Sequence, residues 1–234
     1  MIRYLKLIGF CLVMAVLFQG CAIVIIPEIM PGKSSLREKE IIEPRGWFVS
    51  DKILIVDISG FLSSSSDSGL LSFQENSVEE LKEILRMAEK DGNIKAVLLR
   101  IDTPGGEVTA SDIMYRELKK FREKTEKPVV AEIMSIGASG GYYIATAADK
   151  IYAHPTAITG SIGVISVFPN LRGLTSKIGV DMRIIKSGEN KDLGSMWRDF
   201  SPEQRRILQG LIDEYYERFV DIVLENRKGL SRED

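Results

Sequence analysis

Short apolar runs alternate with amphipathic stretches along most of this chain. Apolar runs over residues 52–58, 94–101 and 128–133 predict buried strands. Between them, residues 77–90 and 108–124 carry apolar side chains at helical spacing and therefore predict helices. This repeated order of strand and helix predicts an α/β fold with a mostly parallel sheet.

The alternation continues into the C-terminal half. The serine-rich run 63–69 predicts a mobile loop between the first strand and the first helix. The remaining expected elements are a third helix, three further strands and a long final amphipathic helix, at residues 139–148, 151–153, 163–168, 182–185 and 202–228. At this length the elements fit one domain, which we place at residues 52–234.

The N-terminus follows a different pattern. A positively charged start precedes the uninterrupted apolar run 7–18, a combination typical of an export signal. Cys21, which follows a glycine, fits a lipoprotein cleavage site, whereas the apolar residues 22–26 make the run long enough for an uncleaved transmembrane helix. Both alternatives stay open, and in both the body of the protein is exported. We therefore expect a signal or membrane anchor over 1–26 and a tether over 27–51.

Composition narrows the chemistry that the domain can perform. The chain has 234 residues, of which 44% are hydrophobic, and a formal net charge of −2, values typical of a globular protein. It has no basic cluster, which argues against nucleic acid as a partner. Both cysteines, Cys11 and Cys21, lie in the N-terminal apolar segment. The cysteines therefore offer the domain no thiol nucleophile, zinc cluster or disulfide framework, and we expect no metal and no cofactor.

A serine in a run of small residues is the candidate nucleophile. Ser139 follows the strand expected at 128–133 and lies in the sequence Gly137-Ala138-Ser139-Gly140-Gly141. Flanking glycines permit a tight strand-to-helix turn, and the N–H groups of the following helix face any developing negative charge. The alternative is a turn that only lets the helix pack closely on the sheet.

The partners of such a serine are few. The single histidine, His154, precedes a proline at the end of a short strand, so we interpret it as a turn residue and expect a neutral lysine as the base. A second glycine-rich loop, Asp102-Thr103-Pro104-Gly105-Gly106, leaves the strand expected at 94–101. Its N–H groups would supply half of an oxyanion hole, unless it is an ordinary turn. Loops at the carboxyl ends of parallel strands are where functional residues gather.

Four motifs occur together in one order along the chain. They are Asp102-Thr103-Pro104-Gly105-Gly106, Ala138-Ser139-Gly140-Gly141-Tyr142-Tyr143, Thr159-Gly160-Ser161-Ile162-Gly163-Val164 and Lys186-Ser187-Gly188-Glu189-Asn190-Lys191-Asp192. This series resembles the signal peptide peptidase A family of membrane-bound serine peptidases, which has a ClpP/crotonase-like fold. The resemblance runs from about Lys52 to the end of the chain. It implies a Ser–Lys dyad, in agreement with the single histidine.

The resemblance also implies roles for individual residues. Ser139 is the implied nucleophile, Lys191 the implied general base, and Ser161 the residue that orients the lysine. Lys186 competes with Lys191 on chemistry alone but does not match the family's base. A lysine accepts a proton at neutral pH only when its pKa is lowered by desolvation, so we expect the carboxylate of Asp192 to point away from the dyad.

The oxyanion hole follows from two of the same motifs. The resemblance implies that the backbone N–H of Gly106, rather than that of Gly105, is one donor. Gly140, which follows the nucleophile directly, is the implied second donor.

Partners and location are likewise implied by the resemblance. They are a ring-like homo-oligomer in which serine and lysine meet across subunits, and substrates that are remnant signal peptides or other unstructured membrane-proximal segments. The implied location is the bacterial cell membrane, with the catalytic domain on the exported side. The chain stops earlier than the family does, which leaves open a fragment or a short member. The alternative functions are a catalytically incompetent peptide-binding scaffold and a crotonase-like acyl enzyme.

Overall fold

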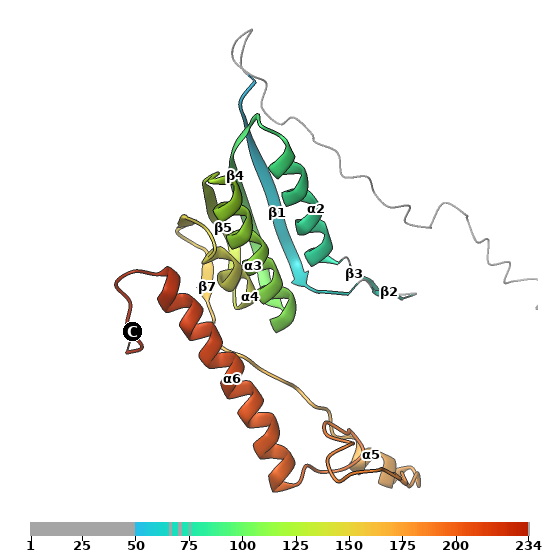
Figure 1. Cartoon of the computed structure of the whole chain (residues 1–234). Coiled ribbons are helices and arrows are strands. Elements are labelled where there is room, and N and C mark those ends of the chain that lie inside the picture. The colour runs from blue at the N-terminus through green and yellow to red at the C-terminus, as the bar shows by residue number, and fades with distance from the viewer. Residues whose placement is uncertain (1–49, 66, 70–71, 75, 234) are drawn as a thin grey trace, which may run out of the picture. The chain divides into compact units, whose positions relative to one another are not determined.

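The computed structural model describes residues 50–65, 67–69, 72–74 and 76–233 (Figure 1). The chain divides into two units, Met1–Glu43 and Pro44–Asp234, and the description below concerns the second. The expected anchor lies outside the described residues, as does the expected tether apart from its last two residues. Within the described ranges, no helix combines the length and the apolar character needed to cross a membrane.

A five-stranded sheet confirms the expected mostly parallel α/β arrangement. Its strand order is β1-β4-β5-β6, and β7 pairs with the carboxyl end of β5. All of these neighbours run parallel. The strands are β1 (Lys52–Leu62), β4 (Ile94–Gly106), β5 (Val129–Ala138), β6 (Lys150–Ala153) and β7 (Ile158–Gly160).

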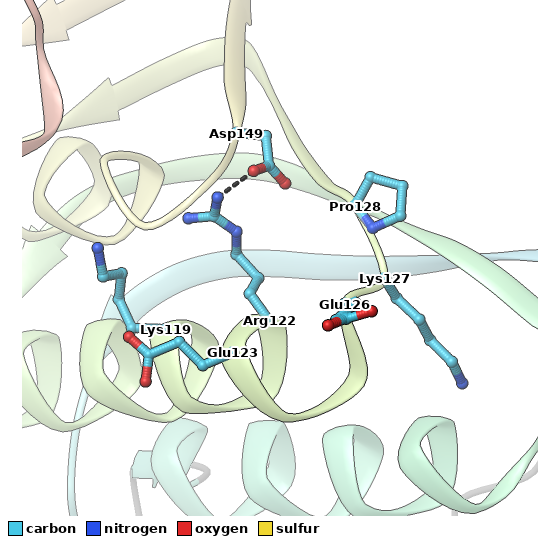
Figure 2. Close-up of a pocket in the computed structure, with 7 residues that line it drawn as sticks. All are labelled: Lys119, Arg122, Glu123, Glu126, Lys127, Pro128 and Asp149. Carbon is cyan, nitrogen blue, oxygen red and sulfur yellow. Dashed lines mark hydrogen bonds and ion pairs between the residues drawn. The ribbon is translucent and has the colours of Figure 1, made fainter.

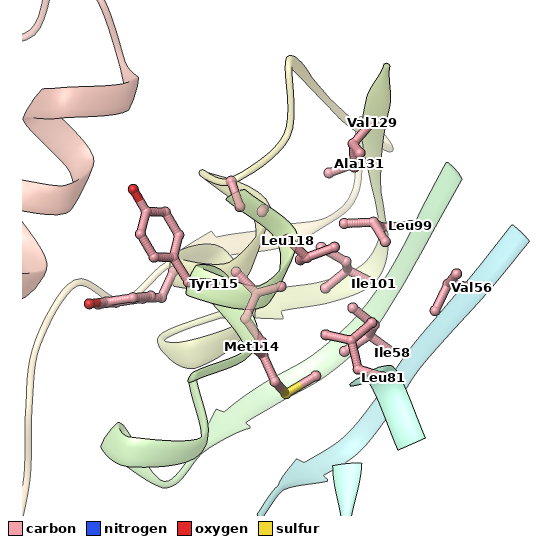
Figure 3. Close-up of a cluster of buried hydrophobic side chains, with 14 of the residues drawn as sticks. Val56, Ile58, Leu81, Leu99, Ile101, Met114, Tyr115, Leu118, Val129 and Ala131 are labelled. Atoms are coloured by element: carbon pink, nitrogen blue, oxygen red, sulfur yellow. The ribbon is translucent and has the colours of Figure 1, made fainter. Parts of the chain in front are cut away.

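Helices cover the apolar face of this sheet. They are α2 (Ser77–Lys90), α3 (Val108–Thr125) and the short α4 (Gly140–Ala145). α2 begins where the side chain of Asn76 accepts a hydrogen bond from the N–H of Glu79. Figure 3 shows the core between sheet and helices, in which Leu99, Ile101 and Leu118 are fully buried.

The C-terminal helix α6 (Pro202–Asn226) is the last element. It begins with a capping box formed by Ser201 and Gln204, at the residue where the helix expected over 202–228 begins. Its C-terminal half joins the core, where the ring of Phe219 packs 4.9 Å from the ring of Tyr143.

Two expected strands are wrong. Among the described residues, no strand forms over 163–168 or 182–185, and the only regular element between β7 and α6 is the short helix α5 (Arg172–Lys177). Ile165 is 83% exposed and Ile185 fully exposed. A strand needs a neighbouring backbone to pair with, and an apolar pattern does not reveal whether one is available.

Two smaller expectations are corrected as well. The third helix ends at Ala145 instead of continuing to residue 148. The serine-rich segment is not simply a loop, because β2 (Asp67–Gly69) and β3 (Ser72–Gln74) form a short antiparallel hairpin. Ser63 is fully buried, so the start of this segment is held in place.

Candidate active site

Ser139 occupies a strained turn between β5 and α4. Its backbone angles are φ 51° and ψ −119°, a combination that residues with a side chain rarely adopt. Its N–H donates to the carbonyl of Gly160 at 2.8 Å, and its carbonyl accepts from the N–H of Tyr143 at 2.9 Å. Ser139 thus lies in a sharp strand-to-helix turn at the carboxyl edge of the sheet, a type of turn in which nucleophilic serines occur in other folds.

The loop that ends β4 lies against this turn. A Cβ atom on Gly105 would lie 2.7 Å from the nitrogen of Gly140 and 3.0 Å from the Cβ of Ser139, and Gly105 has φ +105°. The nitrogen of Gly106 is 3.3 Å from the position of a Cβ on Gly140. Only glycines permit this close approach of the two loops.

The end of this loop pairs with the end of β1, where Gly106 lies opposite Leu62. The next residue, Glu107, donates its N–H to the carbonyl of Leu62 at 2.9 Å. A Cβ atom on Gly106 would overlap the backbone of Leu62, so the end of β1 also lies directly against this glycine.

Ser161 lies close to the same turn. It directly follows β7, which pairs with β5 over residues 136–138, and its neighbour Gly160 accepts the hydrogen bond from Ser139. Ser161 is exposed and has φ +52°. The fold therefore brings Ser139, Gly140, Gly106 and Ser161 together at one edge of the sheet.

Lys191 is not joined to this group. Its side chain is exposed, and among the described residues no hydrogen bond or ion pair connects it to Ser139. Its N–H donates to the carbonyl of Gly188 at 3.2 Å within the loop before α6. In a single chain, the serine turn and the glycine loop at the end of β4 therefore lie together, and no described bond joins Lys191 to them.

The carboxylate of Asp192 faces other cations. It accepts hydrogen bonds from Arg198 at 2.6 Å and from Lys186 at 2.8 Å, and these bonds hold the pKa of Asp192 well below its usual range. Lys186 also donates to the carbonyl of Glu189 at 2.6 Å. In this chain the Asp192 carboxylate is therefore directed to Arg198 and Lys186, and its orientation relative to an assembled dyad stays a prediction.

His154 is a turn residue, as expected. Its ring Nδ1 lies 2.8 Å from the hydroxyl of Thr156, and its carbonyl accepts the N–H of Ala157. The ring is exposed in the turn between β6 and β7.

Two polar clusters beside the site were not predicted. In one, the hydroxyl of Tyr143 donates to Asp112 at 2.8 Å, and burial raises the pKa of this tyrosine. In the other, the carboxylate of Glu107 bonds to Ser63 and Ser64. The partners are 31 to 44 residues apart in the chain, so no local spacing signals either cluster.

A polar pocket of about 320 Å³ lies at the other end of β5, before its first residue (Figure 2). Arg122 pairs there with Asp149, and Lys127 donates to the carbonyls of Ala88 and Asp91. These bonds tie helix ends to the start of the sheet. The pocket is lined by Lys119, Arg122, Glu123, Glu126, Lys127, Pro128 and Asp149.

Comparison with known proteins identifies the family of this chain. Residues 121–233 match the model of peptidase family S49. A candidate signal peptide peptidase SppA of Enterococcus faecium is 32% identical over 202 residues, which are 86% of this chain and 58% of that protein. This chain belongs to the S49 peptidases. Ser139, Ser161 and Lys191 all fall within the matched residues of this S49 chain.

Further matches agree with this family. A candidate protease of Synechocystis is 41% identical to the S49 chain over 176 residues, 75% of this chain and 58% of that protein. The chloroplastic serine protease SPPA of Arabidopsis thaliana is 37% identical over 174 residues, 73% of this chain and 25% of that protein. A second family model, that of the N-terminal domain of NfeD1b, matches residues 62–173. The S49 chain thus spans less than two thirds of the relatives it matches.

Proposed function

We propose that this protein is a serine endopeptidase that works through a Ser–Lys dyad, with Ser139 as nucleophile and Lys191 as general base. The observation that carries the proposal is the strained turn of Ser139, packed against the glycine loop that ends β4. A strained backbone of this kind persists only where surrounding contacts hold it in place, and such strain is typical of functional sites.

The proposed reaction follows from these groups. The Oγ of Ser139 attacks the carbonyl carbon of the scissile peptide bond while its proton passes to the neutral amine of Lys191. The N–H groups of Gly106 and Gly140 stabilise the oxyanion. The protonated lysine then gives its proton to the leaving amine. In the second step, water attacks the acyl-enzyme while the neutral lysine accepts a proton from the water, and the lysine returns that proton to the Oγ of Ser139. Ser161 orients the lysine.

The dyad in this proposal forms between two subunits. Lys191 is exposed in one chain, and a lysine becomes a base at neutral pH only when desolvation lowers its pKa. A second copy packed on this loop would supply that desolvation. The apolar side chains between β7 and α6 support such packing, because Ile165, Val167, Ile178 and Ile185 are all more than 60% exposed.

Substrate and location complete the proposal. We place the enzyme at the bacterial cell membrane with its domain on the exported side, held by residues 1–26 as a lipoprotein or a transmembrane anchor. Its substrates would be remnant signal peptides or other unstructured membrane-proximal segments. The apolar N-terminal run and the relative named as a signal peptide peptidase support this assignment. The specific fold we propose is ClpP/crotonase-like.

Labelling with a serine-reactive fluorophosphonate tests the dyad. The detergent-extracted wild-type protein should be labelled, whereas Ser139→Ala and Lys191→Ala should not. Lys186→Ala is the matched control, because it removes the neighbouring lysine and should leave labelling within about twofold. Labelling of Ser139→Ala would contradict the proposed nucleophile. An assembled wild type that binds peptides without being labelled would favour the scaffold.

A further inference from the structure

The residue after the proposed oxyanion donor carries an unusual set of bonds. Glu107 follows Gly106, and four hydrogen bonds join it to the end of β1 and the loop beyond. Its N–H donates to the carbonyl of Leu62 at 2.9 Å. Its carboxylate accepts from the Ser63 hydroxyl at 3.1 Å, and from the N–H and hydroxyl of Ser64 at 2.9 and 2.7 Å.

The Glu107 carboxylate does not cap the helix that it precedes. Glu107 is the N-cap residue of α3, a position where the side chain of Ser, Thr, Asp or Asn commonly accepts bonds from the first N–H groups of the helix. Its side chain makes no such bond. It reaches instead to Ser63, which is fully buried, and to Ser64, whose carbonyl accepts a bond from Asn76 at the start of α2.

Gly105 and Gly106, which precede Glu107, have no side chains that could fix their backbone conformation. Their conformation depends on the residues on either side, because glycine has access to more backbone conformations than any other residue. On one side, the hydroxyl of the buried Thr103 accepts the N–H of Gly105 at 3.0 Å and donates to the carbonyl of Gly60. On the other side, the anchor is Glu107.

We propose that Glu107 is a positioning residue for the oxyanion hole: its carboxylate, bound to Ser63 and Ser64, fixes the direction of the Gly106 N–H. This inference rests on the proposed peptidase function. The hydrogen bonds from Ser64 also hold the pKa of Glu107 below its usual range, so the carboxylate stays charged at neutral pH.

The role predicts a specific kinetic signature. An oxyanion donor acts on the transition state more than on the bound substrate, and loss of one donor costs about 10²–10³ in kcat. Glu107→Ala would displace the donor without removing it, so we expect kcat to fall about tenfold with KM within about twofold of wild type. Glu107→Gln keeps part of the acceptor capacity and should lose less.

A peptide aldehyde separates this role from a general loss of structure. Ser139 would add to the aldehyde and form a tetrahedral adduct whose oxygen occupies the hole, so its affinity should fall in parallel with kcat. Measurements use the full-length protein and a fluorogenic peptide, with Glu123→Gln as control because Glu123 is exposed on the same helix. Unchanged kcat and aldehyde affinity in Glu107→Ala would overturn the inference, as would a change in KM alone.

Hydrogen exchange distinguishes an error in the proposed role of Glu107 from an error in the proposed peptidase function. Amides of residues 103–107 should exchange faster in Glu107→Ala than in the wild type, and at the wild-type rate in Glu123→Gln. Unchanged exchange in an active protein would overturn the role of Glu107 alone. A wild type that neither cleaves peptide nor reacts with the aldehyde would instead overturn the peptidase function, whatever the exchange rates.

Discussion

The backbone of Ser139 stores strain that a smaller residue would relieve. Its φ of 51° and ψ of −119° are held by hydrogen bonds to Gly160 and from Tyr143. Such a conformation costs about 1–3 kcal/mol in a residue with a Cβ atom. We conclude that stability is given up at this position to hold a half-buried serine in the turn.

Two substitutions of this serine test the strain. Ser139→Ala and Ser139→Gly both remove the hydroxyl, but only glycine removes the Cβ atom. We expect Ser139→Gly to be more stable than Ser139→Ala by about 1 kcal/mol, because the larger entropy of the unfolded glycine chain offsets part of the relief. Denaturant unfolding at matched protein concentration measures the difference. Equal free energies of unfolding would show that the turn is unstrained.

Gly105 allows the glycine loop at the end of β4 to approach this turn. An added Cβ would lie 2.7 Å from the backbone nitrogen of Gly140, at a φ of +105°. We therefore expect Gly105→Ala to lower the rate of fluorophosphonate labelling at least about tenfold and to destabilise the fold by about 1–3 kcal/mol. Gly92→Ala is the control, since nothing lies within 4 Å of a Cβ there. Similar labelling rates for both variants would contradict the described contact.

Residues of the candidate site differ in how far the sequence predicts them. The serine turn and the glycine loop are recognisable because each depends on small residues that are adjacent in the chain. The sequence did not predict Glu107, because its proposed role depends on Ser63 and Ser64, which are 43 or 44 residues away in the chain. An acidic residue at a helix start is ordinary by itself, and only the folded chain shows where its carboxylate is directed.

At the scale of elements, Asp112 on α3 joins the C-terminal helix to the helix that follows Ser139. Its carboxylate accepts from Arg218 of α6 and, at 2.8 Å, from the hydroxyl of Tyr143 in α4. Burial raises the pKa of Asp112, but hydrogen bonds from Arg218, Tyr143 and Arg116 outweigh it, and the pKa is lowered overall. The charged form is therefore the one that holds α6 in place.

This junction makes stability depend on pH. Because the pKa of Asp112 is lower in the folded protein than the unfolded value of about 3.9, its stabilisation is complete above that pH and is lost as pH falls through the folded pKa. Asp112→Asn should be less stable than wild type by about 1–3 kcal/mol at pH 7, and its stability should fall less steeply below about pH 4. Urea unfolding between pH 3 and 7 tests this, with the exposed Asp181→Asn as control. Parallel curves for wild type and Asp112→Asn would contradict it.

Elements inside the core were predictable, and those outside it were not. The apolar runs that became β1, β4 and β5 have neighbouring strands within the chain, so their pattern and their pairing agree. The runs 163–168 and 182–185 are also rich in apolar residues, but they form no strand in the described part of the chain. Apolar alternation shows which side chains favour burial, and it does not identify the surface that buries them.

At the scale of the whole molecule, the proposed site is divided between two parts of the chain. The carboxyl edge of the sheet holds Ser139 and the glycine loop, whereas Lys191 lies in the loop before α6 and is exposed. That loop is attached to α6, since Asn190 donates to Glu203 at 3.2 Å. If the dyad forms between subunits, an isolated chain is inactive and assembly completes the enzyme.

Mixing two inactive variants tests whether subunits share the site. In a closed ring, each site would combine Ser139 of one subunit with Lys191 of its neighbour. An equal mixture of Ser139→Ala and Lys191→Ala subunits, assembled together, should then recover about a quarter of the wild-type sites, because each site receives an intact serine and an intact lysine with a probability of about one half each. If both residues came from one chain, the mixture would stay inactive.

A second mixture provides the matched control. Wild-type subunits mixed equally with the double variant Ser139→Ala/Lys191→Ala should retain about a quarter of the sites if the dyad is shared, and about half if it lies within one chain. Fluorophosphonate labelling counts the sites in both mixtures. An inactive first mixture together with half activity in the second would assign Ser139 and Lys191 to the same chain. Since Lys191 is exposed in the single chain, that result would require its loop to move toward the sheet within one subunit.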